Sequence, residues 1–366
     1  MFKKYYDIIK HNNHKRPFII YNSNNVVQKI KQWTQLLPNI KPFYAIKCNP
    51  DINIIKLMDR NNMNFDCASK NELKLLTRHS ISPNRIIFAN PSKMVEHLKY
   101  AKYKKIDLMT FDSIEELNKI AANYNNARLI VRIKVDDSKS LLQFNKKFGV
   151  DTDNVDSLLS YAKMLKLNIV GCSFHIGSRC TDYGMYEYAL YKTRLVYDIA
   201  MKMNYHMNII NIGGGFSGTD YNLFANTAST INNSIKFYYK DKDVQFMAEP
   251  GRYFVESAYT IVTKVINKKK VGDSFIYYIS EGVYGSFNNV LTDKAEIKIN
   301  TFRKGQLYRT IIFGPSCDSL DCIATDIMMP ELFINDTIYC EDMGAYTTSC
   351  ATSFNGFKPA EIKYTL

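Results

Sequence analysis

The chain has 366 residues, of which 46% are hydrophobic and 23% charged, a globular composition that excludes a disordered chain, a coiled coil and a small disulfide scaffold. Its net charge is +13, from 48 Lys and Arg against 35 Asp and Glu. The basic residues form only short runs, so this surplus favours a solvated surface, and we expect neither a nucleic-acid nor a membrane partner.

Eight short apolar runs follow one another along the first two thirds of the chain, with helix-like segments such as Lys70–His79 and Ser113–Ala122 between them. In chain order the runs are Phe43–Ile46, Phe65–Ala68, Ile86–Ala89, Leu108–Phe111, Leu129–Ile133, Ile169–Phe174, Ile209–Ile212 and Gln245–Ala248. Continuous apolar strands alternating with helices are typical of a parallel sheet covered on both faces. Eight such units favour an α/β fold with a (β/α)8 TIM barrel over the alternative, an open doubly wound sheet.

The pattern changes near residue 257, after which strands follow one another without helices. The predicted strands are Tyr259–Ile266, Phe275–Ile279, Ile311–Phe313 and Thr337–Tyr339. They indicate a C-terminal antiparallel β domain. The early run Phe18–Tyr21 is assigned to the same domain. We therefore expect a barrel over residues 24–257 and a β domain formed by residues 1–23 and 258–366.

The eight cysteines include no C-x-x-C pair, which excludes a zinc ribbon and a thioredoxin motif, and we expect no metal site. The N-terminus lacks the apolar stretch of a signal peptide, and no segment approaches 18 apolar residues. These features predict a cytoplasmic protein with reduced thiols.

Chemically interesting residues lie where barrel strands end, which is where the active sites of such barrels form. Lys47 ends the first strand, Asp66 lies in the second, His175 follows the sixth, Gly213–Gly215 ends the seventh, and Glu249–Arg252 ends the eighth. The glycines would let backbone N–H groups approach a phosphate, although a simple turn is the alternative. Lys47 could be a desolvated amine suited to Schiff-base formation, or a surface lysine. His175 could be a core residue, and Glu249 could merely pair with Arg252.

Longer motifs run in order through nearly the whole chain. They are Pro42–Asn49, Asn64–Ser69, Ser173–Ser178, Ile212–Phe216, Ala248–Tyr253, Gly282–Asn288, Gly314–Asp318, Gly344–Tyr346 and Ser353–Phe357. Together they resemble the eukaryotic ornithine decarboxylase family of pyridoxal-phosphate-dependent decarboxylases. The resemblance implies an alanine-racemase-like fold, a barrel plus a β domain, and pyridoxal 5′-phosphate as cofactor.

The resemblance also assigns roles to individual residues. Lys47 would hold the cofactor covalently and later release the product, with Asp66 beside it. His175 would stack on the pyridine ring, and Glu249 would keep the ring nitrogen protonated, which makes the ring a strong electron sink. The remaining cofactor contacts it implies are Ser178, Gly215, Arg252 and Tyr346 at the phosphate, together with Gly213, Gly214 and Gly251.

Glu249 favours decarboxylation, because racemases of this fold have an arginine at its position. In the family, the cysteine equivalent to Cys317 returns a proton to Cα after CO2 leaves, a role that a thiol with a pKa near neutral can fill. The family's Cys-Asp pair, here Cys317 and Asp318, reaches the site from the other subunit. The resemblance thus implies a homodimer with shared active sites.

Substrate choice depends on fewer residues. Asp318 and Asp293 resemble the two acids that hold the distal amine of ornithine, and Phe354 falls among the family's substrate contacts. We expect decarboxylation of L-ornithine to putrescine in polyamine biosynthesis. However, Thr292-Asp293-Lys294 departs from the usual Tyr-Asp-His, and compact viral relatives altered here prefer arginine. Arginine and lysine decarboxylation are therefore the alternatives.

Two further classes of protein share this fold, and the motifs argue against each. Diaminopimelate decarboxylases have Cys-Glu-Ser where this chain has Cys317-Asp318-Ser319. A non-catalytic regulator like antizyme inhibitor would have lost cofactor residues, and here every such position is suitably occupied. One position departs from the family, since Asn211 replaces the usual Asp before the glycines. Binding of an antizyme-like inhibitor is left open.

Overall fold

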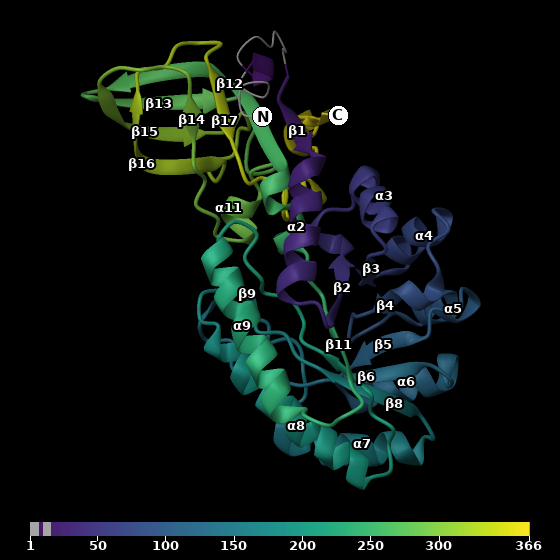
Figure 1. Ribbon diagram of the computed structural model, residues 1–366. Helices are drawn as coiled ribbons and strands as arrows, with labels where there is room; N and C mark the ends of the chain where they lie inside the picture. The colour runs from purple at the N-terminus through teal and green to yellow at the C-terminus, as the bar shows by residue number, and fades with distance from the viewer. Residues whose placement is uncertain (1–6, 10–15, 366) are drawn as a thin grey trace. The chain divides into compact units, whose positions relative to one another are not determined.

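The computed structural model describes residues 7–9 and 16–365 (Figure 1). The chain divides into two compact units, the first formed by residues 1–27 and 255–366 and the second by residues 28–254. Of the segment 1–23 expected to join the β domain, residues 1–6 and 10–15 lie outside the described part of the chain.

The second unit is built on a closed barrel of eight strands, all paired in parallel (Figure 1). In chain order they are β2 (Ile40–Ala45), β3 (Asn64–Cys67), β4 (Ile86–Phe88), β5 (Leu108–Phe111), β6 (Arg128–Arg132), β8 (Asn168–Ser173), β10 (Ile209–Asn211) and β11 (Gln245–Ala248). Each coincides with one of the eight predicted apolar runs to within a few residues. The predicted TIM barrel is confirmed.

Side chains from six different strands fill the barrel interior. They are Phe43, Ile87, Leu108, Ile130, Val170 and Met247, each less than 8% exposed. Six strands can contribute to one cluster only on the face that the closed sheet encloses. The apolar character of these short strands is therefore explained by burial on both faces, inside the barrel and under the helices.

Helices alternate with the barrel strands and lie on the outside of the barrel (Figure 1). They are α2 (Ser23–Leu36), α3 (Ile52–Arg60), α4 (Lys70–Arg78), α5 (Val95–Tyr103), α6 (Ile114–Tyr124), α7 (Val155–Met164), α8 (Gly184–Lys202), α9 (Tyr221–Tyr238) and the short α10 (Arg252–Val255). Local sequence sets where some of them begin. The Oγ atoms of Ser69 and Ser113 accept hydrogen bonds from the N–H groups of Glu72 and Glu116, which caps α4 and α6.

The first unit contains a sheet of eight strands. They are β1 (Phe18–Asn22), β12 (Tyr259–Val271), β13 (Ser274–Ile279), β14 (Asn300–Thr301), β15 (Leu307–Phe313), β16 (Cys322–Pro330), β17 (Thr337–Cys340) and β18 (Glu361–Thr365), with the short helix α11 (Asn289–Thr292). The predicted β domain is present, and Phe18 pairs with Val262 in it, as its assignment to this domain requires. Most pairs are antiparallel, but β1 with β18 and β13 with β15 are parallel, so the sheet is mixed.

Two smaller observations bear on the sequence expectations. The eight cysteines all lie within the described residues, and none of them forms a disulfide there. Across residues 7–9 and 16–365, no helix combines the length and the apolar character that crossing a bilayer requires. A short two-stranded sheet, β7 (Ser140–Leu142) with β9 (Ser178–Cys180), belongs to the second unit and carries Ser178.

Candidate active site

Lys47 and Asp66 meet at the carboxyl ends of adjacent barrel strands. Lys47 lies in a single 3-10 turn, η1 (Ile46–Cys48), directly after β2, while Asp66 lies in β3. The Lys47 Nζ atom is 2.6 Å from Oδ2 of Asp66, whose side chain is 1% exposed. The second carboxylate oxygen of Asp66 is buried and has no hydrogen-bond partner among the described residues. The amine is thus held in place beside a buried negative charge, while 46% of the lysine side chain is exposed to receive a ligand.

Glu249 follows β11 and is bonded to the strand beside it. Its Oε1 atom accepts a hydrogen bond of 2.6 Å from Nδ2 of Asn211, whose own Oδ1 accepts from the N–H of Gly213. The backbone N–H of Glu249 donates to the carbonyl oxygen of Gly213. Burial raises the pKa of Glu249 to about 7, and the nearby charge of Asp66 acts in the same direction. Asn211 is therefore compatible with the loop, since its amide ties the glycine turn to the Glu249 carboxyl.

His175 follows β8 and is neutral at physiological pH. Burial, and then the positive charges of Arg132 and Lys47, hold the pKa of its imidazole well below the ordinary value. Its Nδ1 atom accepts a hydrogen bond from the N–H of Gly177, and the ring of Phe144 lies 4.8 Å away, centroid to centroid. A neutral imidazole whose ring is held in place by this hydrogen bond and ring contact can stack on a flat aromatic ligand.

The glycine turn after β10 leaves no room for side chains. Gly213 has φ +63°, a left-handed conformation that glycine adopts without strain. At Gly214 a Cβ atom would lie 2.9 Å from the carbonyl oxygen of Glu249 and 2.9 Å from Nε2 of His175. Glycine at position 214 thus lets the turn pack closely against two of the predicted site residues, Glu249 and His175.

Gly214→Ala is therefore expected to weaken pyridoxal phosphate binding about tenfold or more, because the new methyl group must displace the Glu249 backbone or the His175 ring. The measurement is an absorbance titration of the apoprotein with the cofactor. Gly184→Ala, at the start of α8, is the matched control and should leave the affinity unchanged. An unchanged dissociation constant for Gly214→Ala would remove the turn from the site.

The segment from Glu249 to Arg252 is anchored to the strand that precedes Lys47. The N–H of Ala45, the last residue of β2, donates to the carbonyl oxygen of Pro250 at 3.2 Å. Gly251 follows this anchor, and Arg252 begins α10 with only 7% of its surface exposed. The buried guanidinium is suited to an anionic ligand group.

Sequence reasoning missed Arg132, the last residue of β6. Its guanidinium lies over the ring of Phe148 at 4.9 Å, and one terminal nitrogen is buried with no hydrogen-bond partner among the described residues. Burial lowers its pKa, whereas the charges of Glu249 and Asp112 act in the opposite direction. The sequence held a signal for it, because Arg132 is a charged residue next to the end of the fifth predicted barrel strand, Leu129–Ile133.

Cys317 and Asp318 lie in the first unit, in the loop that joins β15 to β16. The Cys317 side chain is exposed, and its backbone N–H donates to Oδ1 of Asn355. Oδ1 of Asp318 accepts from the N–H of Leu320 at 3.0 Å, and Oδ2 accepts from the hydroxyl of Tyr284. These two bonds, the amide first, hold the pKa of Asp318 below its ordinary value, so its carboxylate is ionised at neutral pH.

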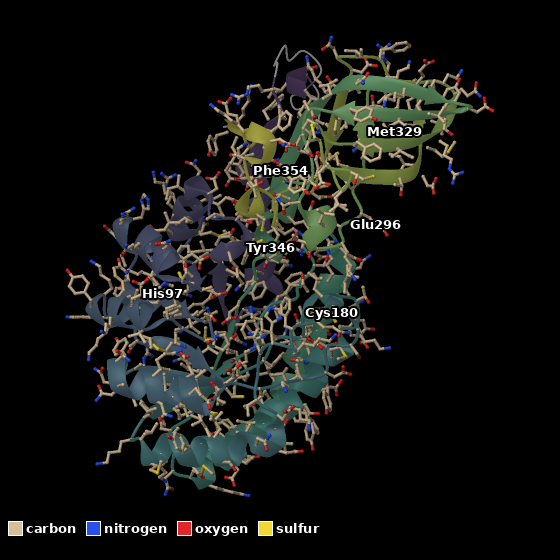
Figure 2. All side chains as sticks on the ribbon, turned by 180° about the vertical axis from the view of Figure 1, so that it is seen from behind. His97, Cys180, Glu296, Met329, Tyr346 and Phe354 are labelled. Atoms are coloured by element: carbon tan, nitrogen blue, oxygen red, sulfur yellow. The ribbon has the colours of Figure 1, made fainter. Side chains whose placement is uncertain are left out.

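The other predicted residues of the first unit lie at separate points of it. Asp293 follows α11 and is 3% exposed. Tyr346 has φ +55°, a conformation uncommon for tyrosine. Phe354, labelled with Tyr346 in Figure 2, belongs to η6 (Phe354–Gly356), and its ring centroid is 4.3 Å from that of Tyr284. Tyr284 therefore contacts two predicted substrate residues, Asp318 and Phe354.

Glu281, also in the first unit, makes stability depend on pH. Burial raises its pKa from 4.5 to about 7, and its Oε1 atom accepts from the N–H groups of Gly282 and Ser286. The folded chain keeps a proton on Glu281 that the unfolded chain releases above pH 4.5. The free energy of unfolding therefore falls as the pH rises from 4.5 to about 7, because the folded chain holds this proton and the unfolded chain does not. The total loss is about 3 kcal/mol at most.

Glu281→Gln is expected to remove that pH dependence, because the amide oxygen still accepts both N–H groups and cannot ionise. Urea unfolding at pH 5 and pH 8 measures the difference in unfolding free energy between variant and wild type. The variant should gain on the wild type at pH 8 relative to pH 5. An identical difference at the two pH values would contradict the raised pKa.

The residues of the second unit fit pyridoxal 5′-phosphate. Lys47 offers an exposed amine, His175 a neutral ring for stacking, and Glu249 a carboxyl for the pyridine nitrogen. The side-chain-free turn at Gly213–Gly215 and the buried Arg252 suit a phosphate. The unpartnered atoms of Asp66 and Arg132 are polar groups that such a ligand would satisfy.

Comparisons with known proteins agree with this fit. Residues 23–256 match the family model described as pyridoxal-dependent decarboxylase, pyridoxal binding domain. The chain is 40% identical over 361 residues to ornithine decarboxylase of Schizosaccharomyces pombe, covering 95% of this chain and 83% of that protein. It is 39% identical over 368 residues to antizyme inhibitor 2 of Xenopus laevis, covering 95% of this chain and 81% of that protein.

A solved structure of a decarboxylase has the same fold as this chain. The arginine decarboxylase of Paramecium bursaria Chlorella virus, bound to agmatine, has a TM-score of 0.96 and 35% identity, with 100% of each chain covered. The alanine-racemase-like combination of barrel and β domain is thus shared. The chain belongs to the pyridoxal-dependent decarboxylases, within the ornithine decarboxylase group, and is an amino-acid decarboxylase whose cofactor is pyridoxal 5′-phosphate.

Proposed function

We propose that this enzyme decarboxylates basic L-amino acids, with L-ornithine as substrate and putrescine and CO2 as products, and that it serves polyamine biosynthesis. The observation that carries the proposal is the ionised carboxylate of Asp318 beside the thiol of Cys317, with the aromatic rings of Tyr284 and Phe354 alongside. A fixed carboxylate selects a substrate with a distal ammonium group. Eight cysteines without a disulfide among them support the cytoplasm as the compartment.

The residues of the second unit have distinct tasks in this proposal. The Lys47 amine binds the cofactor, and Asp66 holds Nζ in position. Pyridoxal phosphate supplies the electron sink that stabilises the negative charge left on Cα when CO2 departs. Glu249 holds a proton at the pyridine nitrogen, and the neutral His175 covers the ring without adding a competing positive charge. Ser178, Gly215 and Arg252 bind the phosphate.

Cys317 returns the proton in the proposed reaction. The carboxylate carbon leaves as CO2, and its bonding electron pair remains with Cα. The S–H bond of Cys317 then breaks as a C–H bond forms at Cα, and the thiolate regains a proton from solvent. The exposure of Cys317 in its loop supports this last exchange.

Arginine is the second candidate substrate, and two observations favour it. The viral arginine decarboxylase structure matches the chain over its full length, with a TM-score of 0.96. The segment Thr292-Asp293-Lys294 departs from the Tyr-Asp-His usual in ornithine decarboxylases. Asp293 is nevertheless retained, which keeps ornithine first.

The test is to incubate the enzyme and cofactor separately with ornithine, arginine, lysine and meso-diaminopimelate, and to measure CO2 and the amine product. Putrescine as the main product supports the proposal. Agmatine or cadaverine as the main product would support decarboxylation of a basic amino acid but would show that ornithine is not the preferred substrate. No CO2 from any of them, despite bound cofactor, would point to a regulator such as the antizyme inhibitor that the chain resembles.

We further propose that the enzyme is a homodimer in which Cys317 of one subunit serves the Lys47 site of the other. Cys317 belongs to the first unit and Lys47 to the second, and the exposure of Cys317 supports its use by another chain. Lys47→Ala and Cys317→Ala should each form little amine product alone, and should regain about a quarter of the wild-type rate of amine formation when mixed and allowed to exchange subunits.

The expected quarter follows from random pairing, in which half of the dimers are mixed and each mixed dimer has one intact site of two. Formation of the amine product in the mixture measures it, because Cys317 acts only after CO2 has left, and sedimentation gives the oligomeric state. Two copies of Lys47→Ala labelled differently provide the exchange control. No recovery despite subunit exchange would show that each chain uses its own Cys317.

A further inference from the structure

Both oxygens of the Asp318 carboxylate are held, and by different parts of the chain. Oδ1 accepts the N–H of Leu320 within its own loop, at 3.0 Å. Oδ2 accepts the hydroxyl of Tyr284, which is 34 residues away in sequence. The backbone bond fixes one end of the carboxylate, so the tyrosine bond decides how the group is turned about its own axis.

Tyr284 is itself firmly fixed. Its carbonyl oxygen accepts from the N–H of Thr352 at 2.8 Å and from the hydroxyl of the same residue at 3.2 Å. On the preceding residue, the N–H of Val283 donates to Oδ1 of Asp321 at 2.8 Å. The tyrosine ring lies against Phe354, marked in Figure 2, at an interplanar angle of 37°. Backbone and ring are both constrained, so the hydroxyl has a defined position.

The buried carboxylate of Asp321 joins the Tyr284 turn to the Asp318 loop. Its two oxygens accept separately from Val283 in the turn and from Ser316 in the loop, at 2.8 and 2.9 Å. Its side chain is 1% exposed, and such charge-assisted bonds to backbone are strong where water is excluded. Asp321 therefore ties the turn to the loop, and this link helps to keep the Tyr284 hydroxyl beside Asp318.

We propose that Tyr284 is a positioning residue that sets the enzyme's preference among basic amino acids by orienting the Asp318 carboxylate. This inference rests on the proposed function, in which Asp318 binds the distal cation of the substrate. The tyrosine O–H occupies one lone pair of Oδ2, and the remaining lone pair can accept a hydrogen bond from the substrate's ammonium group. Ornithine and lysine differ by one methylene, so a carboxylate in a fixed orientation discriminates between them, and one free to turn does not.

Tyr284→Phe tests this role, because phenylalanine keeps the ring contact with Phe354 and loses only the hydroxyl. The expected result is a KM for ornithine raised about tenfold with kcat changed less than about twofold, and an ornithine-to-lysine preference reduced by a similar factor. Cofactor content and thermal unfolding should match the wild type. Tyr308→Phe is the matched control, since that hydroxyl contacts only Gln306 among the described residues, and its kinetics should not change.

A double-mutant cycle with Asp318→Asn separates positioning from a general structural effect. In the Asp318→Asn background the loss of the Tyr284 hydroxyl should change KM by less than about twofold, because there is no carboxylate left to orient. Equal effects in the two backgrounds, or an unchanged KM in Tyr284→Phe, would overturn the role of Tyr284 and leave the proposed function intact. A wild type that decarboxylates no basic amino acid would overturn both.

If arginine proves the best substrate, the same cycle is run with arginine against ornithine. The expected KM-specific loss and the coupling to Asp318 are unchanged, since a guanidinium also needs an oriented carboxylate. A loss confined to kcat would contradict the proposal, because it would place Tyr284 in the proton-transfer step beside Cys317.

Discussion

Lys47→Ala should abolish the visible absorbance of lysine-bound pyridoxal phosphate and lower kcat/KM by about 10⁴-fold or more. The reason is chemical, because alanine has no amine with which to hold the cofactor or to release the product. The geometry makes Lys47 the residue to test, since its Nζ lies 2.6 Å from the buried Asp66 at the carboxyl end of β2. Absorbance spectra and CO2 release, measured on protein loaded with excess cofactor, give the two readouts.

Lys41→Ala is the matched control for this experiment. Lys41 lies in β2, the strand that precedes the turn carrying Lys47. Its Nζ donates a hydrogen bond to Oε1 of Gln245, an exposed residue at the start of β11. Its removal should leave both the spectrum and the rate unchanged. Persistence of the absorbance band in Lys47→Ala would show that another lysine binds the cofactor covalently and would contradict the proposed assignment of the site.

Glu249→Gln should lower kcat by about 10²–10³-fold while the cofactor remains bound. Glutamine has nearly the same shape and still accepts the hydrogen bond from Asn211, so the loop is expected to keep its conformation. It carries no negative charge, however, and a neutral amide cannot hold the pyridine nitrogen protonated. The rate is measured as CO2 release at saturating substrate, and absorbance reports the loading with cofactor.

Glu249→Asp shows whether charge or shape matters at this position. The shorter side chain keeps the negative charge, so it should restore part of the activity that Glu249→Gln loses. Equal activity of Glu249→Gln and wild type would remove the ring nitrogen from the catalytic role proposed for this residue. Equal loss in both variants would indicate that packing around Asn211 is what matters.

In the proposed reaction the two units have different tasks. Lys47, Asp66, His175 and Glu249 all come from strand ends of one closed barrel, where parallel strands deliver side chains to a common edge. Cys317 and Asp318 come from a loop of the β unit, held by Asp321 and Tyr284. The positions of the proposed cofactor residues thus depend on barrel closure, whereas the proposed selectivity depends on local contacts in the sheet domain.

Much of this protein follows from the sequence alone. The eight barrel strands were predictable because each is a short apolar run between helices, and burial on both faces demands such runs. The position of Lys47, His175 and Glu249 at the carboxyl ends of strands was predictable, because the chain order of the strands fixes which residues follow them. The cofactor followed from motifs spread over nearly the whole chain.

Several features were decided only by the tertiary structure. The parallel pairing of β13 with β15 depends on contacts between segments that no local pattern connects. Arg132 gains its significance from the charges of Glu249 and Asp112 near it, and Asn211 from the Glu249 carboxyl that it bonds. Tyr284 and Asp318 are far apart in sequence, and only folding sets the hydroxyl against the carboxylate. Hydrophobic periodicity specifies strands and their order, but side-chain hydrogen bonds between distant segments are fixed only when the chain has folded.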